Sequence, residues 1–230
     1  MTLAITNLSC SYGAVQAVQD ASLEAPAGRI TCVMGRNGVG KTTLLRSVMG
    51  QLKAKGSVTL AGTEIGAMPA HRRSKQGLAL VPQGREIFPK LTVEENLLVG
   101  LSARSDSLRT VPELAYETFP ILRDFRRRMG GDLSGGQQQQ LAIARAMVGN
   151  PKVLLLDEPT EGIQPNIIEE IGRVLQRLAA GGMAVVLVEQ YLDFVREIGH
   201  AFAIMDRGRI VARGETRELT SEVVGQWLSV

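Results

Sequence analysis

The stretch Gly35-Arg36-Asn37-Gly38-Val39-Gly40-Lys41-Thr42-Thr43 decides the fold, and it follows the apolar run Ile30–Met34. It matches the pattern G-x-x-x-x-G-K-[ST], in which a glycine-rich loop joins a buried strand to a helix. The backbone N–H groups of such a loop and the N-terminal end of the helix surround phosphate oxygens. We therefore expect Gly35–Thr43 to bind a nucleoside triphosphate, with the Lys41 ammonium on the β- and γ-phosphates and the Thr42 hydroxyl on Mg²⁺.

The overall composition is that of a folded soluble protein. Of the 230 residues, 44% are hydrophobic and 21% are charged. No apolar run approaches the roughly 20 residues of a membrane helix, and Met1–Asn7 lacks the basic and apolar regions of an export signal. Cys10 and Cys32 have neither a metal-ligand spacing nor a disulfide framework. We expect one cytosolic domain over residues 1–230, in which both cysteines serve packing.

The net charge of +3 makes nucleic-acid binding an alternative to consider. The basic residues that would form such a surface are Arg72, Arg73, Lys75, Arg123, Arg126, Arg127 and Arg128. These runs are short, and only Phe125 is interleaved with them. We interpret them as solvated faces or as contacts with a protein partner.

Strand-like and helix-like segments alternate through most of the chain, which indicates an α/β fold with a mainly parallel central sheet. Expected strands are Leu3–Leu8 at a sheet edge, Val18–Glu24, Arg29–Met34, a hairpin over 57–65, Leu78–Val81, Val153–Leu156, Met183–Val188, and a terminal hairpin of 201–205 with 210–213. Expected helices begin at Lys41, Pro69, Pro165 and Tyr191. From about residue 91 to residue 130 the composition changes to a helical insertion, and the early strands indicate an N-terminal antiparallel β subdomain.

Three further positions have chemistry suited to a bound nucleotide. Tyr12, in a turn after the first strand, can stack on the adenine, although a single Tyr is more often a packing residue. Gln83 ends a strand, where it can offer its carbonyl to a metal and its amide to a water; without that context it would be a turn residue. Asp157 and Glu158 end a continuously apolar strand, so Asp157 can hold Mg²⁺ and Glu158 can accept a proton from the attacking water. Capping of the next helix is the alternative for this carboxylate pair.

The stretch Leu133-Ser134-Gly135-Gly136-Gln137 opens another expected helix. Its serine and glycines at a helix N-terminus indicate a second anion-binding site. Because one chain contains one complete phosphate loop, we expect this second site to complete the nucleotide site of another subunit.

Taken in order, Gly35–Thr42, Gln83, Leu133–Gln137 and Val153–Glu158 resemble the ATP-binding subunit of ABC transporters over essentially the whole chain. The resemblance implies a P-loop NTPase fold, with ATP and Mg²⁺ as cofactors. It assigns adenine stacking to Tyr12, contact with the metal and a transmembrane partner to Gln83, the partner's γ-phosphate to Ser134–Gly136, and general-base catalysis to Glu158.

Two positions depart from the commonest family pattern. Gln190 stands where many members have a histidine on the γ-phosphate, and Gln164 stands where an aspartate is usual. Gln190 can hydrogen-bond there but cannot act as an imidazole acid or base. Both departures resemble the branched-chain amino acid and amide importers. Pro82–Pro89, the glutamines Gln137–Gln140 and Glu161–Pro165 are most similar to the ATP-binding subunit of urea importers.

The resemblance implies a cytoplasmic ATPase that is peripheral on the inner face of the cell membrane. Its implied partners are transmembrane permease subunits, a second ATP-binding subunit, identical or related, and, indirectly, a periplasmic solute-binding protein. The expected solute is urea or a related amide, with branched-chain amino acids as the alternative. An ABC-type ATPase acting on nucleic acid or ribosomes resembles two fused cassettes or a cassette split by a long coiled coil, and this sequence shows neither pattern. A nucleotide sensor without hydrolysis is disfavoured by the intact pair Asp157-Glu158.

Overall fold

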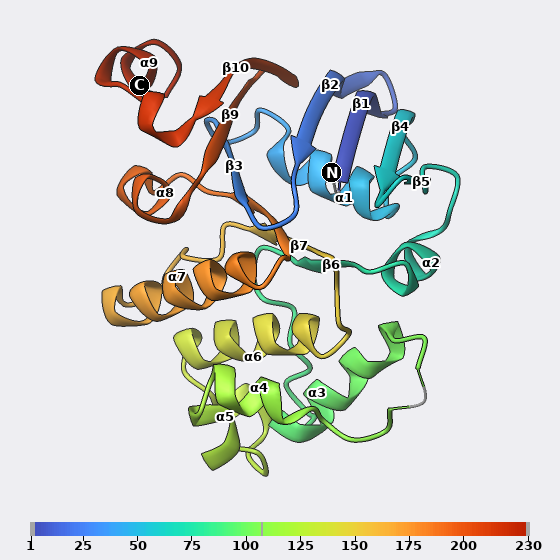
Figure 1. Cartoon of the computed structure of the whole chain (residues 1–230), viewed down its shortest axis with the longest axis vertical. Coiled ribbons are helices and arrows are strands. Elements are labelled where there is room, and N and C mark those ends of the chain that lie inside the picture. Colours follow the sequence, from blue (N-terminus) through green and yellow to red (C-terminus); the bar gives the residue numbers. More distant parts are fainter. Residues whose placement is uncertain (1–2, 107, 229–230) are drawn as a thin grey trace.

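The computed structural model describes residues 3–106 and 108–228, which form two sheets with helices packed between and around them (Figure 1). The strands are β1 (Leu3–Tyr12), β2 (Val15–Ala25), β3 (Ile30–Met34), β4 (Lys55–Leu60), β5 (Thr63–Glu64), β6 (Leu78–Val81), β7 (Val153–Asp157), β8 (Ala184–Val188), β9 (Ala201–Asp206) and β10 (Arg209–Glu215). The α-helices are α1 (Lys41–Met49), α2 (Ala70–Lys75), α3 (Val93–Gly100), α4 (Glu113–Thr118), α5 (Ile121–Asp124), α6 (Gly135–Met147), α7 (Pro165–Ala180), α8 (Leu192–Ile198) and α9 (Ser221–Trp227).

The larger sheet has the strand order β10-β9-β3-β8-β7-β6. All its neighbouring strands are parallel except the pair β9 and β10, which form the terminal hairpin. Parallel strands align their carboxyl ends at one edge of the sheet, so the loops after β3, β7 and β8 meet there. The predicted mainly parallel α/β fold is confirmed.

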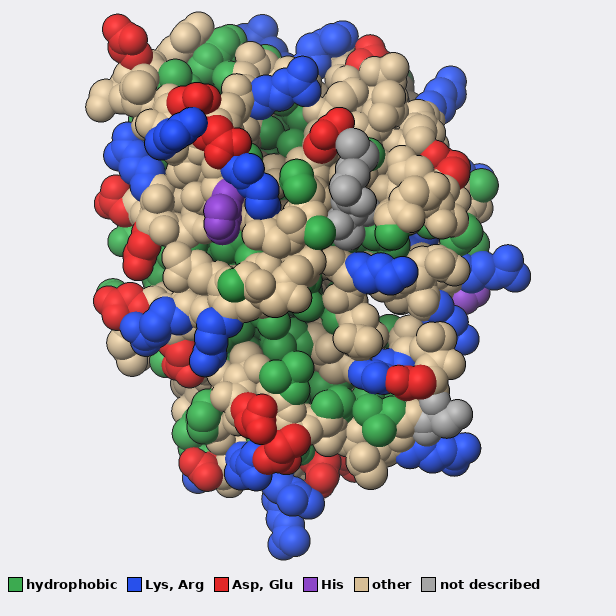
Figure 2. Space-filling view, viewed as in Figure 1, with side chains coloured by type: hydrophobic (Ala, Val, Ile, Leu, Met, Phe, Trp, Pro, Cys, Tyr) green, Lys and Arg blue, Asp and Glu red, His purple; other side chains and the backbone are tan. Residues whose placement is uncertain are grey.

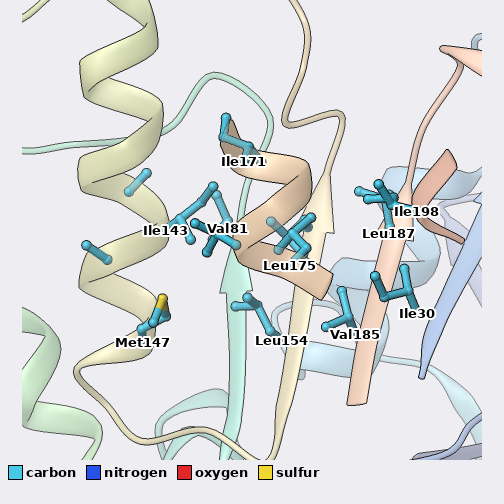
Figure 3. Packing of buried hydrophobic residues seen from close by; sticks show 14 of the residues in the cluster. Ile30, Val81, Ile143, Met147, Leu154, Ile171, Leu175, Val185, Leu187 and Ile198 are labelled. Atoms are coloured by element: carbon cyan, nitrogen blue, oxygen red, sulfur yellow. The ribbon is translucent and has the colours of Figure 1, made fainter. Parts of the chain in front are cut away.

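Both faces of this sheet are covered, and β7 shows how. Leu154 and Leu156 belong to the hydrophobic cluster of α6, α7 and α8, whereas Val153 and Leu155 belong to the cluster around α1. Figure 3 shows Leu154 and Leu175 of α7 in the same cluster, with α6, which carries Ile143 and Met147, at the left. A strand buried on both faces needs an apolar residue at every position, which is why the sequence shows a continuous run here.

The smaller, antiparallel sheet has the order β2-β1-β4-β5 and packs over α1. The expectation that Leu3–Leu8 forms an edge strand is wrong, because β1 pairs with β2 on one side and with β4 on the other. β1 also extends to Tyr12, so this residue ends a strand, and the turn follows at Gly13 and Ala14. A second neighbour from β4, 43 residues downstream of Tyr12, leaves no local signal in the early sequence.

The helices α3, α4 and α5 lie together beside α6, at the end of the molecule away from the antiparallel sheet (Figure 1). A bridge between Thr92 and Met129 brings the two ends of this insertion together. The predicted helical subdomain is therefore present, while the assignment of 1–230 to a single domain stays a prediction. None of the helices in the described part of the chain is both long and apolar enough to cross a bilayer.

The basic runs considered for nucleic-acid binding are largely engaged within the chain. Arg73 is buried. Arg126 pairs with Glu94 at 3.2 Å, and the Arg128 guanidinium lies 3.8 Å from the Phe125 ring centroid. On the face shown in Figure 2, basic side chains are interspersed with acidic ones. The interpretation of Arg73 as part of a solvated face is wrong, because its guanidinium caps the carbonyl end of α1.

Candidate functional site

The loop Gly35–Gly40 joins β3 to α1, and two of its glycines have no room for a side chain. Gly35 has φ 151°, and a Cβ there would lie 2.4 Å from the Met205 carbonyl oxygen. Gly40 caps α1 at φ 109°, and its Cβ would lie 2.4 Å from the Ala17 carbonyl oxygen. Backbone conformation and close packing therefore both require glycine, and they aim the first N–H groups of α1 into the site.

Lys41 is the first residue of α1, and only 5% of it is exposed. Its ammonium donates to the carbonyl oxygens of Gly35 at 2.8 Å and Arg36 at 3.0 Å. The same nitrogen lies 3.4 Å from Glu158 Oε1. The lysine is therefore held under its own loop, with a carboxylate as its third partner.

Asp157 ends β7 and is buried beside Thr42. Burial raises the pKa of its carboxyl, partly offset by a hydrogen bond from Thr42, and Glu158 raises the pKa further. Oδ1 of Asp157 has no hydrogen-bond partner within the described residues. An unpaired buried carboxylate oxygen beside a hydroxyl fits Mg²⁺, which binds one or two protein oxygens and otherwise water and phosphate. The described residues contain no cluster of three or more His, Cys, Asp or Glu side chains suited to a metal.

Glu158 has a left-handed backbone, with φ 48°, and its N–H donates to the Val188 carbonyl of β8. The Gln190 side-chain amide donates to Glu158 Oε1 and to Asn37 Oδ1, both at 2.7 Å. The Gln83 amide lies 3.5 Å from Glu158 Oε2 and donates more closely, at 2.9 Å, to Glu161. Three residues that follow different strands thus converge on the Glu158 carboxylate, which are Lys41 after β3, Gln83 after β6 and Gln190 after β8.

Lys41, Gln83, Glu158 and Gln190 line a cleft of about 730 Å³, whereas the buried Asp157 is not among the described residues of its wall. The predicted site residues on its wall are Tyr12, Asn37, Gly38, Gly40, Lys41, Thr42, Thr43, Gln83, Glu158 and Gln190. Tyr12 is 50% exposed and lies at the cleft from the end of β1. Gly35, Arg36 and Val39 are not among the described residues that line the cleft, and their carbonyl oxygens accept bonds from Lys41 and Gly208.

The stretch Ser134–Gln137 does not belong to the described residues that line the cleft. It begins α6, where Ser134 and Gln137 form a reciprocal capping box and Ser134 is exposed. Next to it, a Cβ on Gly135 would lie 3.1 Å from the guanidinium of Arg85. Within one chain, the two predicted phosphate-binding elements are therefore separate.

Sequence reasoning missed five residues on the cleft wall, which are Ala17, Thr160, Glu161, Glu189 and Tyr191. Thr160 and Glu161 lie in the loop after β7, and Glu189 and Tyr191 lie in the loop after β8. Their position after buried apolar strands was the available signal, since parallel strands place their following loops at the same edge.

The ABC transporter family model matches residues 18–161, which include the phosphate loop and the Asp157-Glu158 pair of this cleft. The chain belongs to the ABC transporter family. This ABC transporter chain is 38% identical over 211 residues to the high-affinity branched-chain amino acid transport ATP-binding protein BraG of Pseudomonas aeruginosa, covering 91% of each chain. It is 36% identical to the probable branched-chain amino acid transport ATP-binding protein LivF of Archaeoglobus fulgidus, covering 94% of this chain and 93% of that one.

The ABC transporter chain is also similar to a protein named for another role. It is 32% identical to the lipopolysaccharide export system ATP-binding protein LptB of Escherichia coli, covering 96% of this chain and 93% of that one. Its fold matches the crystal structure of a nucleotide-free ATP-binding cassette from an ABC transporter with a TM-score of 0.83 at 27% identity, covering 100% of this chain and 95% of that one. The chain is accordingly an ATP-binding, ATP-hydrolysing cassette.

Proposed function

We propose that this cassette is the ATP-hydrolysing subunit of an importer for a small solute, with Glu158 as the general base. The observation that carries the proposal is the placement of the Glu158 carboxylate, which lies 3.4 Å from the Lys41 ammonium and accepts a bond from Gln190. A water beside the γ-phosphate would have this carboxylate within reach as a proton acceptor.

The positions of the other side chains in and beside the cleft support further roles in binding the metal and the nucleotide. Thr42, Asp157 and Gln83 would supply the protein oxygens around Mg²⁺, and the metal would neutralise charge on the phosphates. Gln190 would hold Glu158 and Asn37 in place and can also hydrogen-bond a phosphate oxygen. Tyr12, half exposed at the cleft, would stack on the base of the nucleotide.

A second ATP-binding subunit would complete the site. Ser134–Gln137 begins a helix and carries an exposed serine, yet it lies outside its own cleft. We propose that it contacts the terminal phosphate bound by the facing subunit. Mixing Ser134→Arg chains with Lys41→Ala chains tests this. Each mixed dimer holds one intact composite site and one site with both substitutions, whereas neither homodimer holds an intact site, so the mixture should show more ATPase activity than the sum of the two separate preparations.

Branched-chain amino acids are the first candidate solute, because BraG and LivF are both named for their transport. Urea or a related amide is the second, on the similarity of Pro82–Pro89 and Glu161–Pro165 to urea importers. Either solute implies transmembrane permease subunits, a periplasmic solute-binding protein and a peripheral position on the inner membrane face. ATPase assays of the reconstituted transporter with each solute and its binding protein separate the two.

Glu158→Gln is the direct test of the proposed mechanism. It keeps the size of the side chain but cannot accept the proton, so turnover should fall by about 10²-fold or more. ATP binding, measured by equilibrium titration, should persist. Turnover within a few-fold of the wild type would remove Glu158 from the role of base.

A further inference from the structure

Glu189 follows β8 directly, and its side chain is buried, with 2% of the residue exposed. Oε1 accepts hydrogen bonds from the Thr160 backbone N–H at 3.1 Å and from the Thr160 hydroxyl at 2.7 Å. Oε2 accepts from the backbone N–H groups of Gln190 at 3.0 Å and Tyr191 at 3.3 Å. One carboxylate therefore serves four donors, two from each of two loops.

The two loops are those that carry the proposed catalytic groups. Thr160 belongs to the loop after β7, two residues beyond Glu158, and Gln190 belongs to the loop after β8. The loops meet a second time where the Gln190 amide donates to Glu158 Oε1 at 2.7 Å. The backbone of Glu189 is itself anchored, because its N–H donates to the Val33 carbonyl of β3, the strand that leads into the phosphate loop.

A carboxylate is the side chain that this arrangement requires. Its two oxygens accept several bonds and donate none, so each oxygen can serve one loop. A glutamine in the same place has only one acceptor oxygen, and its NH₂ group would face N–H donors on one side. Burial raises the pKa of Glu189, whereas the hydrogen bonds from Thr160, Tyr191 and Gln190 lower it. Burying a carboxylate is costly, and here the four donors offset that cost.

We propose that Glu189 is a positioning residue for ATP hydrolysis: its carboxylate holds the loop of Gln190 against the loop of Glu158, so that the Gln190 amide stays on the base. Glu189 does not touch the reacting atoms in this account. The inference rests on the roles proposed above for Glu158 and Gln190.

A double-mutant cycle tests the proposal, with kcat and the KM for ATP measured for the wild type, Glu189→Gln, Gln190→Ala and the double variant. A residue that acts through Gln190 loses its effect when the Gln190 side chain is gone. Glu189→Gln should lower kcat by about tenfold in the wild-type background and by less than about twofold in the Gln190→Ala background. The KM for ATP should change by less than about threefold, because the phosphate loop is untouched.

Glu64→Gln is the matched control. Glu64 also accepts from two backbone N–H groups, of Val58 and Gly66, and from a hydroxyl, but it lies in the hairpin of β4 and β5. Its substitution removes a similar set of hydrogen bonds and should leave kcat unchanged. A comparable fall of kcat in Glu64→Gln would show that general loosening of the fold is the cause, and would overturn the proposal.

Thr160→Val covers the case in which Glu189→Gln does not fold. It removes only the hydroxyl donor to Glu189, so kcat should fall by about two- to fivefold and the fall should vanish with Gln190→Ala. Equal falls in both backgrounds, or an unchanged kcat in the folded variants, would refute the positioning role. If the wild type is active and Gln190→Ala has the same kcat, the proposed role of Gln190 itself is refuted.

Discussion

Arg73 offers a sharp test of how the phosphate-loop helix is held. Its guanidinium donates to the carbonyl oxygens of Ser47 at 3.0 Å and Val48 at 2.6 Å, both at the C-terminal end of α1. It also donates to Met68 at 2.9 Å and to Gly66 at 2.6 Å. A cation at the carbonyl end of a helix interacts favourably with the helix dipole. The Ser47 carbonyl oxygen also accepts from the Gly50 N–H at the end of α1, so Arg73 adds to the capping of this helix.

The cost of Arg73→Ala follows from these four bonds. The bonds to Ser47 and Val48 are buried, and the other two are partly exposed. A hydrogen bond to a charged group contributes about 1.5–3 kcal/mol, so losing the two buried ones alone should cost about 3–6 kcal/mol. In a chain of this size each kcal/mol lowers the melting temperature by about 2–4 °C, which predicts a fall of about 6–24 °C.

Thermal unfolding followed by circular dichroism measures this effect, and Arg72→Ala is the control. Arg72 is the neighbouring residue on α2, but it is exposed. Its replacement should change stability by no more than about 0.5 kcal/mol. Arg73→Lys should be intermediate, because an ammonium lacks the planar fork that reaches carbonyls on several sides. If Arg73→Ala and Arg72→Ala melted within 2 °C of each other, about one kcal/mol or less, the reasoning would be refuted.

Three other substitutions probe the cleft. Gly40→Ala places a Cβ 2.4 Å from the Ala17 carbonyl oxygen at φ 109°, so ATP affinity measured by calorimetry should fall by about tenfold or more. Gln190→Ala removes the 2.7 Å bond to Glu158, and steady-state assays should show kcat lowered by about tenfold with little change in KM. Burial raises the pKa of Asp157, so its contribution to stability is lost as pH rises through that pKa. Asp157→Asn without Mg²⁺ should therefore have a higher melting temperature than the wild type at pH 8, and the difference should shrink as the pH falls below the pKa of Asp157.

The parts of the fold that the sequence predicted well are those with a strong local signal. The glycine-rich loop before α1 and the unbroken apolar run of β7 each allow one structure, because backbone sterics and two-sided burial restrict the residue types. The position of β1 inside its sheet could not be predicted, since it depends on pairing with β4 far along the chain.

The residues of the site divide in the same way, into those that a local motif predicts and those that depend on distant contacts. Lys41 and the Asp157-Glu158 pair follow from motifs, but the burial of Glu189 does not. From the sequence, Glu189 is one more charged residue after a strand, and its role depends on Thr160, 29 residues away. Arg73 was misread for the same reason, because a basic run resembles a solvated face until the carbonyl oxygens around it are known.

The contacts of Lys41 connect phosphate binding with the freedom of the proposed base. An ammonium has three donors, and within this chain they face the carbonyl oxygens of Gly35 and Arg36 and the Glu158 carboxylate. The two carbonyls belong to the loop that surrounds the phosphates, so Glu158 is the partner that a phosphate oxygen can most readily displace. Once displaced, Glu158 would keep its bond from Gln190 and lose its contact with the Lys41 ammonium, so arrival of the phosphate would change the partners of the proposed base.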